Sequence, residues 1–153
     1  MTLLIKPRNQ AKIFLSRYRA IRAQYASAAR EIEDLRASLT GISAPIRSDV
    51  VTGSGPGDKM ADTVARIADM EAQLAGTVRE MADALSEITD AINAVPDAMQ
   101  RAVLYLRYIE GMSWPKICEQ INYSERQAFV IHGRALVAVN EWLGKTRNEG
   151  LRE

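Results

Sequence analysis

The chain has 153 residues, of which 47% are apolar and 25% charged, so it can bury one core, or one small domain with an extended appendage. No apolar run approaches the roughly 20 residues that a membrane span requires. The first ten residues, MTLLIKPRNQ, contain too short an apolar segment for a signal peptide. We therefore expect a cytoplasmic protein without a membrane contact.

Cys118 and His132 are the only cysteine and the only histidine of the chain. One cysteine cannot build a disulfide framework, and the two residues together cannot supply a set of zinc ligands. A catalytic set based on serine or cysteine would need His132, which lies inside a helical pattern without a supporting motif. The sequence therefore predicts no enzyme activity, no metal and no cofactor.

The net charge of +1 hides a segregation of charge along the chain. Residues 1–40 carry eight Lys and Arg against three acids, residues 41–96 carry four against nine, and residues 97–153 carry eight against seven. The pattern predicts that a basic first segment pairs with an acidic second segment.

The first segment has the 4-3 spacing of a coiled-coil seam. Pro7 suits a helix start and Gly41 a helix stop, which predicts one helix of about 33 residues. The apolar residues of its seam are Phe14, Tyr18, Ile21, Tyr25, Ala28, Ile32, Leu35 and Leu39.

A loop is predicted over residues 41–57, where GISAPIRSDVVTGSGPG is rich in Gly, Pro and Ser and has no helical period. Two interpretations remain open. The loop is either a flexible tether or a surface loop with a role of its own.

A second seam helix is predicted after the loop. Glu71 alone interrupts its apolar spacing, so we expect Glu71 to pair with an arginine of the facing helix. The two helices together predict an antiparallel hairpin over residues 1–96. Because two helices leave part of each seam open, we also expect a homo-oligomer formed through residues 8–95. The predicted seam comprises Met60, Val64, Ile67, Glu71, Leu74, Val78, Met81, Leu85, Ile88, Ile92 and Val95.

Residues 97–153 are predicted to form a separate module that contains a helix-turn-helix. Asp97 and Gln100 have the form of a capping box, and the helix that they start is expected to stop at Gly111. Ser113 is expected to cap the next helix, which has the small residue Cys118 where the two helices of the motif approach. Its inward residues are expected to be Ile117, Cys118 and Ile121.

Asn122 is predicted to take the positive φ of a tight turn, because asparagine tolerates this conformation better than most residues. Tyr123 is expected to be an apolar plug after the turn. Ser124 is expected to cap the last helix, with Gln127 at its third position. The buried stripe of that helix is expected to comprise Ala128, Ile131, Ala135, Ala138 and Trp142.

The second helix of such a motif enters the major groove of DNA with its first turns. Arg126 is expected to bind guanine, Gln127 adenine and Glu125 cytosine. Arg134 and Lys116, with His132 on the surface, are expected to face phosphates. The complete set of predicted DNA-binding residues is Ser124, Glu125, Arg126, Gln127, Val130, Arg134 and Lys116.

The segment LYLRYIEGMSWPKICEQINYSERQAFVIHGRAL resembles region 4 of bacterial sigma factors. The combination with an N-terminal helical hairpin resembles phage and prophage regulators of the ArpU and RinA type. These resemblances imply binding to promoter DNA and a contact with RNA polymerase. Because no segment resembles a promoter-melting region, we do not expect the chain to open promoters alone.

The predicted fold class is therefore all-α, and the predicted function is that of a sequence-specific regulator of transcription that binds double-stranded DNA and acts with RNA polymerase. Two alternatives stay open. One is a DNA-packaging protein that recognises DNA as a small terminase subunit does. The other is an interaction protein that binds polymerase or a sigma factor without reading DNA.

Overall fold

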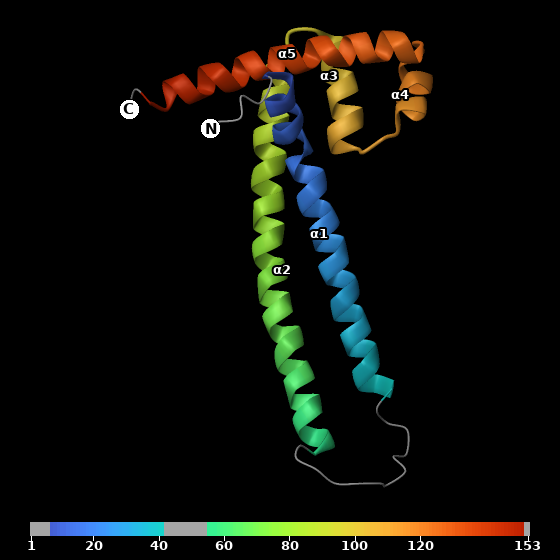
Figure 1. Ribbon diagram of the computed structural model, residues 1–153, viewed down its shortest axis with the longest axis vertical. Coiled ribbons are helices and arrows are strands. Elements are labelled where there is room, and N and C mark those ends of the chain that lie inside the picture. Colours follow the sequence, from blue (N-terminus) through green and yellow to red (C-terminus); the bar gives the residue numbers. More distant parts are fainter. Residues whose placement is uncertain (1–6, 42–54, 152–153) are drawn as a thin grey trace, which may run out of the picture. The chain divides into compact units, whose positions relative to one another are not determined.

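The computed structural model describes residues 7–41 and 55–151, and the regular structure within these ranges is entirely helical (Figure 1). The prediction of an all-α fold is thereby confirmed. No helix in these ranges is long and apolar enough to cross a membrane. The elements are α1 (Pro7–Gly41), α2 (Pro56–Asn93), α3 (Ala98–Leu104), the π-helix η1 (Tyr105–Ile109), α4 (Trp114–Ile121) and α5 (Glu125–Glu149).

The predicted loop 41–57 falls mostly outside the described residues, which resume at Gly55. The chain divides into two compact units. Among the described residues, 21–41 and 55–80 form the hairpin unit, and 7–20 together with 81–151 form a second unit, which we call the α5 unit. The α5 unit is thus larger than the module predicted from Asp97 onward, because the first turns of α1 and the last turns of α2 belong to it.

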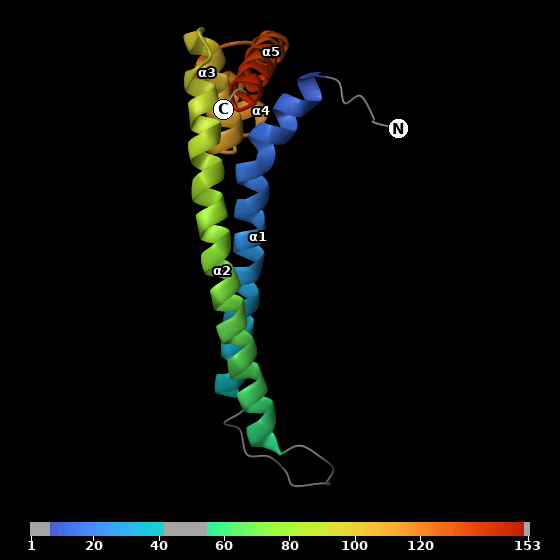
Figure 2. The same ribbon diagram turned by 90° about the vertical axis from the view of Figure 1, so that its left-hand side faces the viewer.

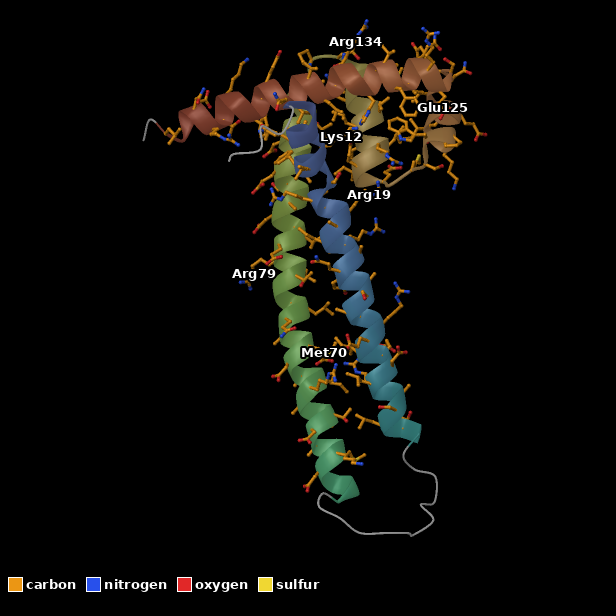
Figure 3. The ribbon with its side chains drawn as sticks, viewed as in Figure 1. Lys12, Arg19, Met70, Arg79, Glu125 and Arg134 are labelled. Carbon is orange, nitrogen blue, oxygen red and sulfur yellow. The ribbon has the colours of Figure 1, made fainter. Side chains whose placement is uncertain are left out.

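In the hairpin unit, α1 and α2 run antiparallel and lie side by side (Figures 1 and 2). The α1 seam within this unit is covered as predicted: Ile32 is buried, and the other seam residues are half-buried. Figure 3 shows Met70 on the side of α2 that faces α1, whereas Arg79 points away.

The residues of α2 that α1 covers are not all those predicted for the seam. The prediction placed Met60, Val64 and Val78 in the seam, but all three are exposed. The apolar stripe of α2 is broader than a single facing helix can cover, so α1 packs on one half of it. The covered residues are Thr63, Ile67, Met70, Leu74 and Thr77.

Two ion pairs join α1 to α2 among the described residues of the hairpin unit. Arg36 pairs with Glu71, which confirms that Glu71 finds an arginine of the facing helix. Glu31 pairs with Arg66 at 2.8 Å. All four side chains are about half exposed, so each pair contributes less than about 1 kcal/mol. Their main effect is to favour one register of the two helices.

The ends of α1 and α2 contribute Leu15 and Ile88, both fully buried, to the apolar core of the α5 unit. The rings of Phe14 on α1 and Trp142 on α5 lie 6.2 Å apart. A further cluster joins α3, η1 and α4 to α5; it comprises Val103, Leu106 and Ile117, with Met112, Trp114, Ile121 and Ile131 packed against it.

Asp97 begins α3 as predicted: its carboxylate accepts the backbone N–H of Gln100 at 2.8 Å. The guanidinium of Arg101 then donates to the carbonyl oxygens of Val95 and Pro96, at 2.7 and 2.8 Å. These bonds satisfy backbone groups at the junction of α2 and α3, so they fix the direction in which the chain leaves the hairpin helix.

The turn between α4 and α5 has the predicted geometry. Asn122 ends α4 with φ 59° and ψ 44°, the left-handed conformation. The N–H of Tyr123 donates to the carbonyl oxygen of Cys118 at 3.2 Å. Ser124 then caps α5. One strained residue thus reverses the chain and sets the angle between the two helices.

Substitutions at Asn122 should separate backbone strain from side-chain contacts. We expect Asn122→Gly to be at least as stable as the wild type, because glycine adopts positive φ without steric cost. We expect Asn122→Val to lower the free energy of unfolding by about 1–2 kcal/mol, since a β-branched residue is disfavoured in this conformation. Urea denaturation followed by circular dichroism measures both changes, and equal stability of the two variants would contradict the account.

Candidate nucleic-acid interface

All seven residues predicted to contact DNA are exposed. Lys116 lies on α4, Ser124 is the N-cap of α5, and the other five lie on α5 itself. Each of them is therefore accessible to a partner, but some of their side chains already form hydrogen bonds within the chain.

Ser124 and Gln127 are engaged with each other in a capping box. The Ser124 hydroxyl accepts the backbone N–H of Gln127 at 3.2 Å, and Gln127 Oε1 accepts the backbone N–H of Ser124 at 3.1 Å. A bidentate contact with adenine needs both the carbonyl and the amino group of Gln127. While the capping box is intact, only its amino group is available.

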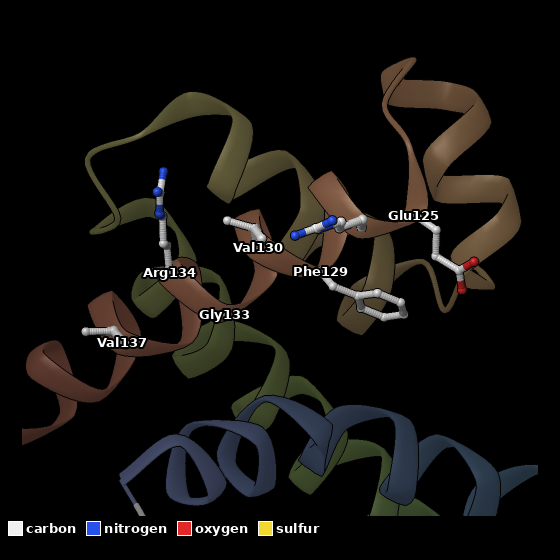
Figure 4. Close-up of a pocket in the computed structure, with 7 residues that line it drawn as sticks. Glu125, Phe129, Val130, Gly133, Arg134 and Val137 are labelled. Carbon is white, nitrogen blue, oxygen red and sulfur yellow. The ribbon is translucent and has the colours of Figure 1, made fainter.

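Four of the predicted residues lie together on one open surface of α5, which we call the outward face (Figure 4). Because a single helix supplies every residue of this surface, it is an exposed face rather than an enclosed cavity. Sequence reasoning missed three of its members, although their spacing opposite the buried stripe was the available signal. The outward face comprises Glu125, Arg126, Phe129, Val130, Gly133, Arg134 and Val137.

One side of the outward face continues into a groove between the start of α3 and the first turns of α5. Arg126, Val130 and Arg134 line both surfaces. Tyr123 also lines the groove and is exposed, so the prediction that it is a buried plug after the turn is wrong. Ile131, by contrast, is half-buried and packs against the core cluster.

The cations of this region are not neutralised within the part of the chain that the structure describes. Arg126, Arg134 and Lys116 form no ion pair there. Their charges are therefore available to an anionic partner.

His132 is buried in the core, with an exposed fraction of 8%, so the prediction that it lies on the surface facing phosphates is wrong. Its Nε2 is 2.8 Å from the hydroxyl of Tyr108. The indole of Trp114 meets the imidazole edge-on, with the ring centres 4.9 Å apart. The tyrosine hydroxyl satisfies the polar ring, which is how a histidine can occupy the buried stripe.

Of the five residues predicted to form the buried stripe of α5, Ala128 and Ala135 are buried. Ile131, Ala138 and Trp142 are half-buried. The structure adds His132, Leu136 and Val139. A wider apolar face of α5 is therefore packed against the core than the predicted stripe implied.

Burial also determines the ionisation of the two hydrogen-bonded groups. Burial, with smaller contributions from the nearby cations Lys12 and Arg107, lowers the pKa of His132 to about 4. Burial raises the pKa of Tyr108 to about 12, against the opposing effect of Arg107 and Arg19. Both groups are therefore neutral at pH 7.

The ring of Phe129 packs against an aromatic side chain of α4. The Phe129 ring lies 4.8 Å from that of Trp114. The guanidinium of Arg107 lies over the indole of Trp114, 5.1 Å from the ring centre. The same guanidinium donates a hydrogen bond to the carbonyl oxygen of Met112 at 2.9 Å. The position of Phe129 on the outward face is therefore fixed by the core.

No group of three or more His, Cys, Asp or Glu side chains that could hold a metal ion occurs among the described residues. The chemistry that the outward face offers is charge, apolar surface and hydrogen bonding.

Because His132 is the only histidine, its ionisation can be followed directly. Its pKa in the folded protein, about 4, lies below the ordinary histidine pKa of 6.5, so the unfolded chain binds more protons between these values. The stability due to neutral His132 is complete above pH 6.5 and should be lost as the pH falls towards 4, by up to about 3 kcal/mol.

Two measurements check this expectation. In an NMR titration the single imidazole signal should titrate near pH 4 rather than near 6.5. The loss of unfolding free energy from pH 7 to pH 5 should be smaller in His132→Gln than in the wild type, because carboxylate titration is common to both. A midpoint near 6.5 would show that the imidazole is not buried as described.

The chain matches no curated protein and no solved structure. One family model matches residues 41–140, and its description is "protein of unknown function (DUF1492)". The match covers α2, α3, η1, α4 and the first four turns of α5, and thus the whole turn between α4 and α5. Because this match takes in about two thirds of the sequence, the chain belongs to the DUF1492 family.

Proposed function

We propose that the protein is a sequence-specific DNA-binding regulator of transcription that works beside RNA polymerase and presents the outward face of α5 to the major groove. The observation that carries this proposal is the exposed face of α5, the helix that follows the left-handed turn at Asn122, with Arg126 in its first turn and Arg134 two turns later. Neither arginine forms an ion pair among the described residues.

The spacing of the two arginines suits this role. Eight residues of helix correspond to about 12 Å along the axis, and the major groove is about 12 Å wide. With Arg126 at the base edges, Arg134 lies near the phosphates at the edge of the groove. Lys116, on the preceding helix, supplies a second phosphate contact of the kind that fixes orientation without reading sequence.

Two substitutions distinguish base contacts from phosphate contacts. The probe is the duplex enriched by the full-length protein from a randomised pool. Arg126→Ala should weaken binding to this duplex by about 1–3 kcal/mol and relax the preference at one base pair. Lys116→Ala should weaken all duplexes alike and reduce the slope of log affinity against log salt by about one.

Arg79→Ala is the matched control, because Arg79 is an exposed arginine of the hairpin unit without an ion pair among the described side chains. It should leave affinity and preference unchanged. If Arg126→Ala changes affinity but not preference, the docking is wrong. If no duplex is bound at low salt, the proposal fails and a protein-binding role replaces it.

We propose in addition that a second copy of the chain packs on the open half of the α2 stripe. Val64 and Val78, two heptads apart, are exposed on this half, and Met60 is exposed near them. Both helices of the hairpin keep a heptad repeat, which is the pattern that packs against another seam helix. Burying these side chains would stabilise a bundle built from two hairpins.

The double variant Val64→Glu, Val78→Glu should lower the molecular mass of the full-length protein in solution, because it places charges in the proposed interface. Light scattering coupled to size-exclusion chromatography measures the mass. The control Ala65→Glu, Ala72→Glu adds the same charges at exposed positions on the opposite side of α2 and should keep the wild-type mass. A monomeric wild type would contradict the proposed assembly.

A further inference from the structure

The middle of the outward face is apolar. Phe129, Val130 and Val137 are exposed by 45%, 48% and 40%. Large apolar side chains at this exposure cost free energy in water. Val130 and Val137 lie on the side of α5 away from its buried stripe, whereas Phe129, seven residues before the buried Leu136, lies at the edge of that stripe. Packing against Trp114 holds Phe129 in place, but it does not cover the exposed part of Phe129, nor does it account for Val130 and Val137.

Gly133 lies between these side chains (Figure 4). A glycine inside a helix costs about 0.5–1 kcal/mol relative to alanine. A Cβ added at Gly133 would meet no atom within 4 Å, so no close contact within the described fold requires glycine here. Gly76 and Gly144 also have open surroundings, but only Gly133 has large exposed apolar residues one turn before and one turn after it.

The apolar residues are bordered by the cations Arg126 and Arg134 and by one anion, Glu125. The two guanidinium groups suit a polyanion better than a second apolar helix, which would have to bury them unpaired. Between the two arginines, Phe129, Val130 and Gly133 offer no side-chain hydrogen-bonding group. The central part of the face therefore cannot read bases through hydrogen bonds.

In the major groove, the apolar feature of an unmodified base pair is the C5 methyl group of thymine. We infer that Phe129 and Val130 contact thymine methyl groups, so that the recognised site carries thymine beside the base pair that Arg126 contacts. This inference rests on the proposed function. The contact requires Phe129 to be fixed, which its packing against Trp114 at 4.8 Å provides.

The experiment removes the methyl group without changing base pairing. In the duplex enriched from the randomised pool, each thymine is replaced in turn by deoxyuridine. At one or two positions the full-length protein should bind about fourfold more weakly, which corresponds to the ~0.8 kcal/mol of one buried methyl-sized group. In the Val130→Ala variant, the effect at one of these positions should fall towards onefold.

Ile13→Ala is the control, since it also shortens an exposed β-branched side chain, one that lies outside the outward face and outside the proposed interface between copies; it should keep the full deoxyuridine effect. A second arm replaces each cytosine by 5-methylcytosine, which carries the same methyl group. Tighter binding at a cytosine, without loss at any thymine, would overturn the assignment to thymine.

The outcomes separate the inference from the function on which it rests. If no duplex is enriched, the proposed DNA binding itself fails. If a duplex is enriched but no deoxyuridine substitution weakens binding, DNA binding stands and methyl recognition is overturned. If Val130→Ala instead lowers the molecular mass of the protein and leaves the deoxyuridine effects intact, the face is an interface between copies and the inference is overturned.

Discussion

The rotation of α5 about its own axis is the constraint on which the candidate site depends. Successive residues of a helix are about 100° apart, so the choice of buried residues decides which residues face outward. His132 sets this choice: its imidazole is held by the Tyr108 hydroxyl and by the edge-on indole of Trp114. With His132 inside, Arg126, Val130 and Arg134 face outward. Rotating α5 by about 100°, the angle between successive residues, would turn an arginine into the core.

The same aromatic cluster connects the core to the surface. Trp114 contacts His132 below and Phe129 above, and Arg107 stacks over its ring. Trp114 is the first residue of α4, and its helix is joined to α5 through the left-handed turn at Asn122. Helix α4, the turn and the outward face are therefore positioned by one set of contacts, so the core holds the outward face in place.

Much of this architecture follows from local sequence signals. The turn at Asn122, the Ser124 cap and the partner of Glu71 depend on one residue type at one position, and each was predictable. The exposed side of α2 was not predictable. That Thr63, Met70 and Thr77 are covered, rather than Val64 and Val78, depends on where α1 lies. A seam pattern gives the width of an apolar stripe, but not the half that a single partner covers.

The buried histidine and the occupied glutamine of the candidate site were also beyond sequence reasoning. His132 becomes an apolar-core residue only because Tyr108, 24 positions earlier, supplies a hydrogen bond. The Gln127 side chain can bind either DNA or the backbone N–H of Ser124. The sequence pattern predicts a capping box, but it does not show which of these two partners the side chain binds. Both cases depend on how individual polar atoms are satisfied, which residue spacing does not reveal.

The central claim is that the outward face of α5 is the surface that meets duplex DNA. The most direct measurement is NMR chemical-shift mapping of the full-length protein, titrated with duplex DNA at low salt. The account predicts that the largest changes fall on the amides of residues 124–137, with small changes at the buried core of the same unit. Changes concentrated in the hairpin unit, or no changes at all, would contradict it.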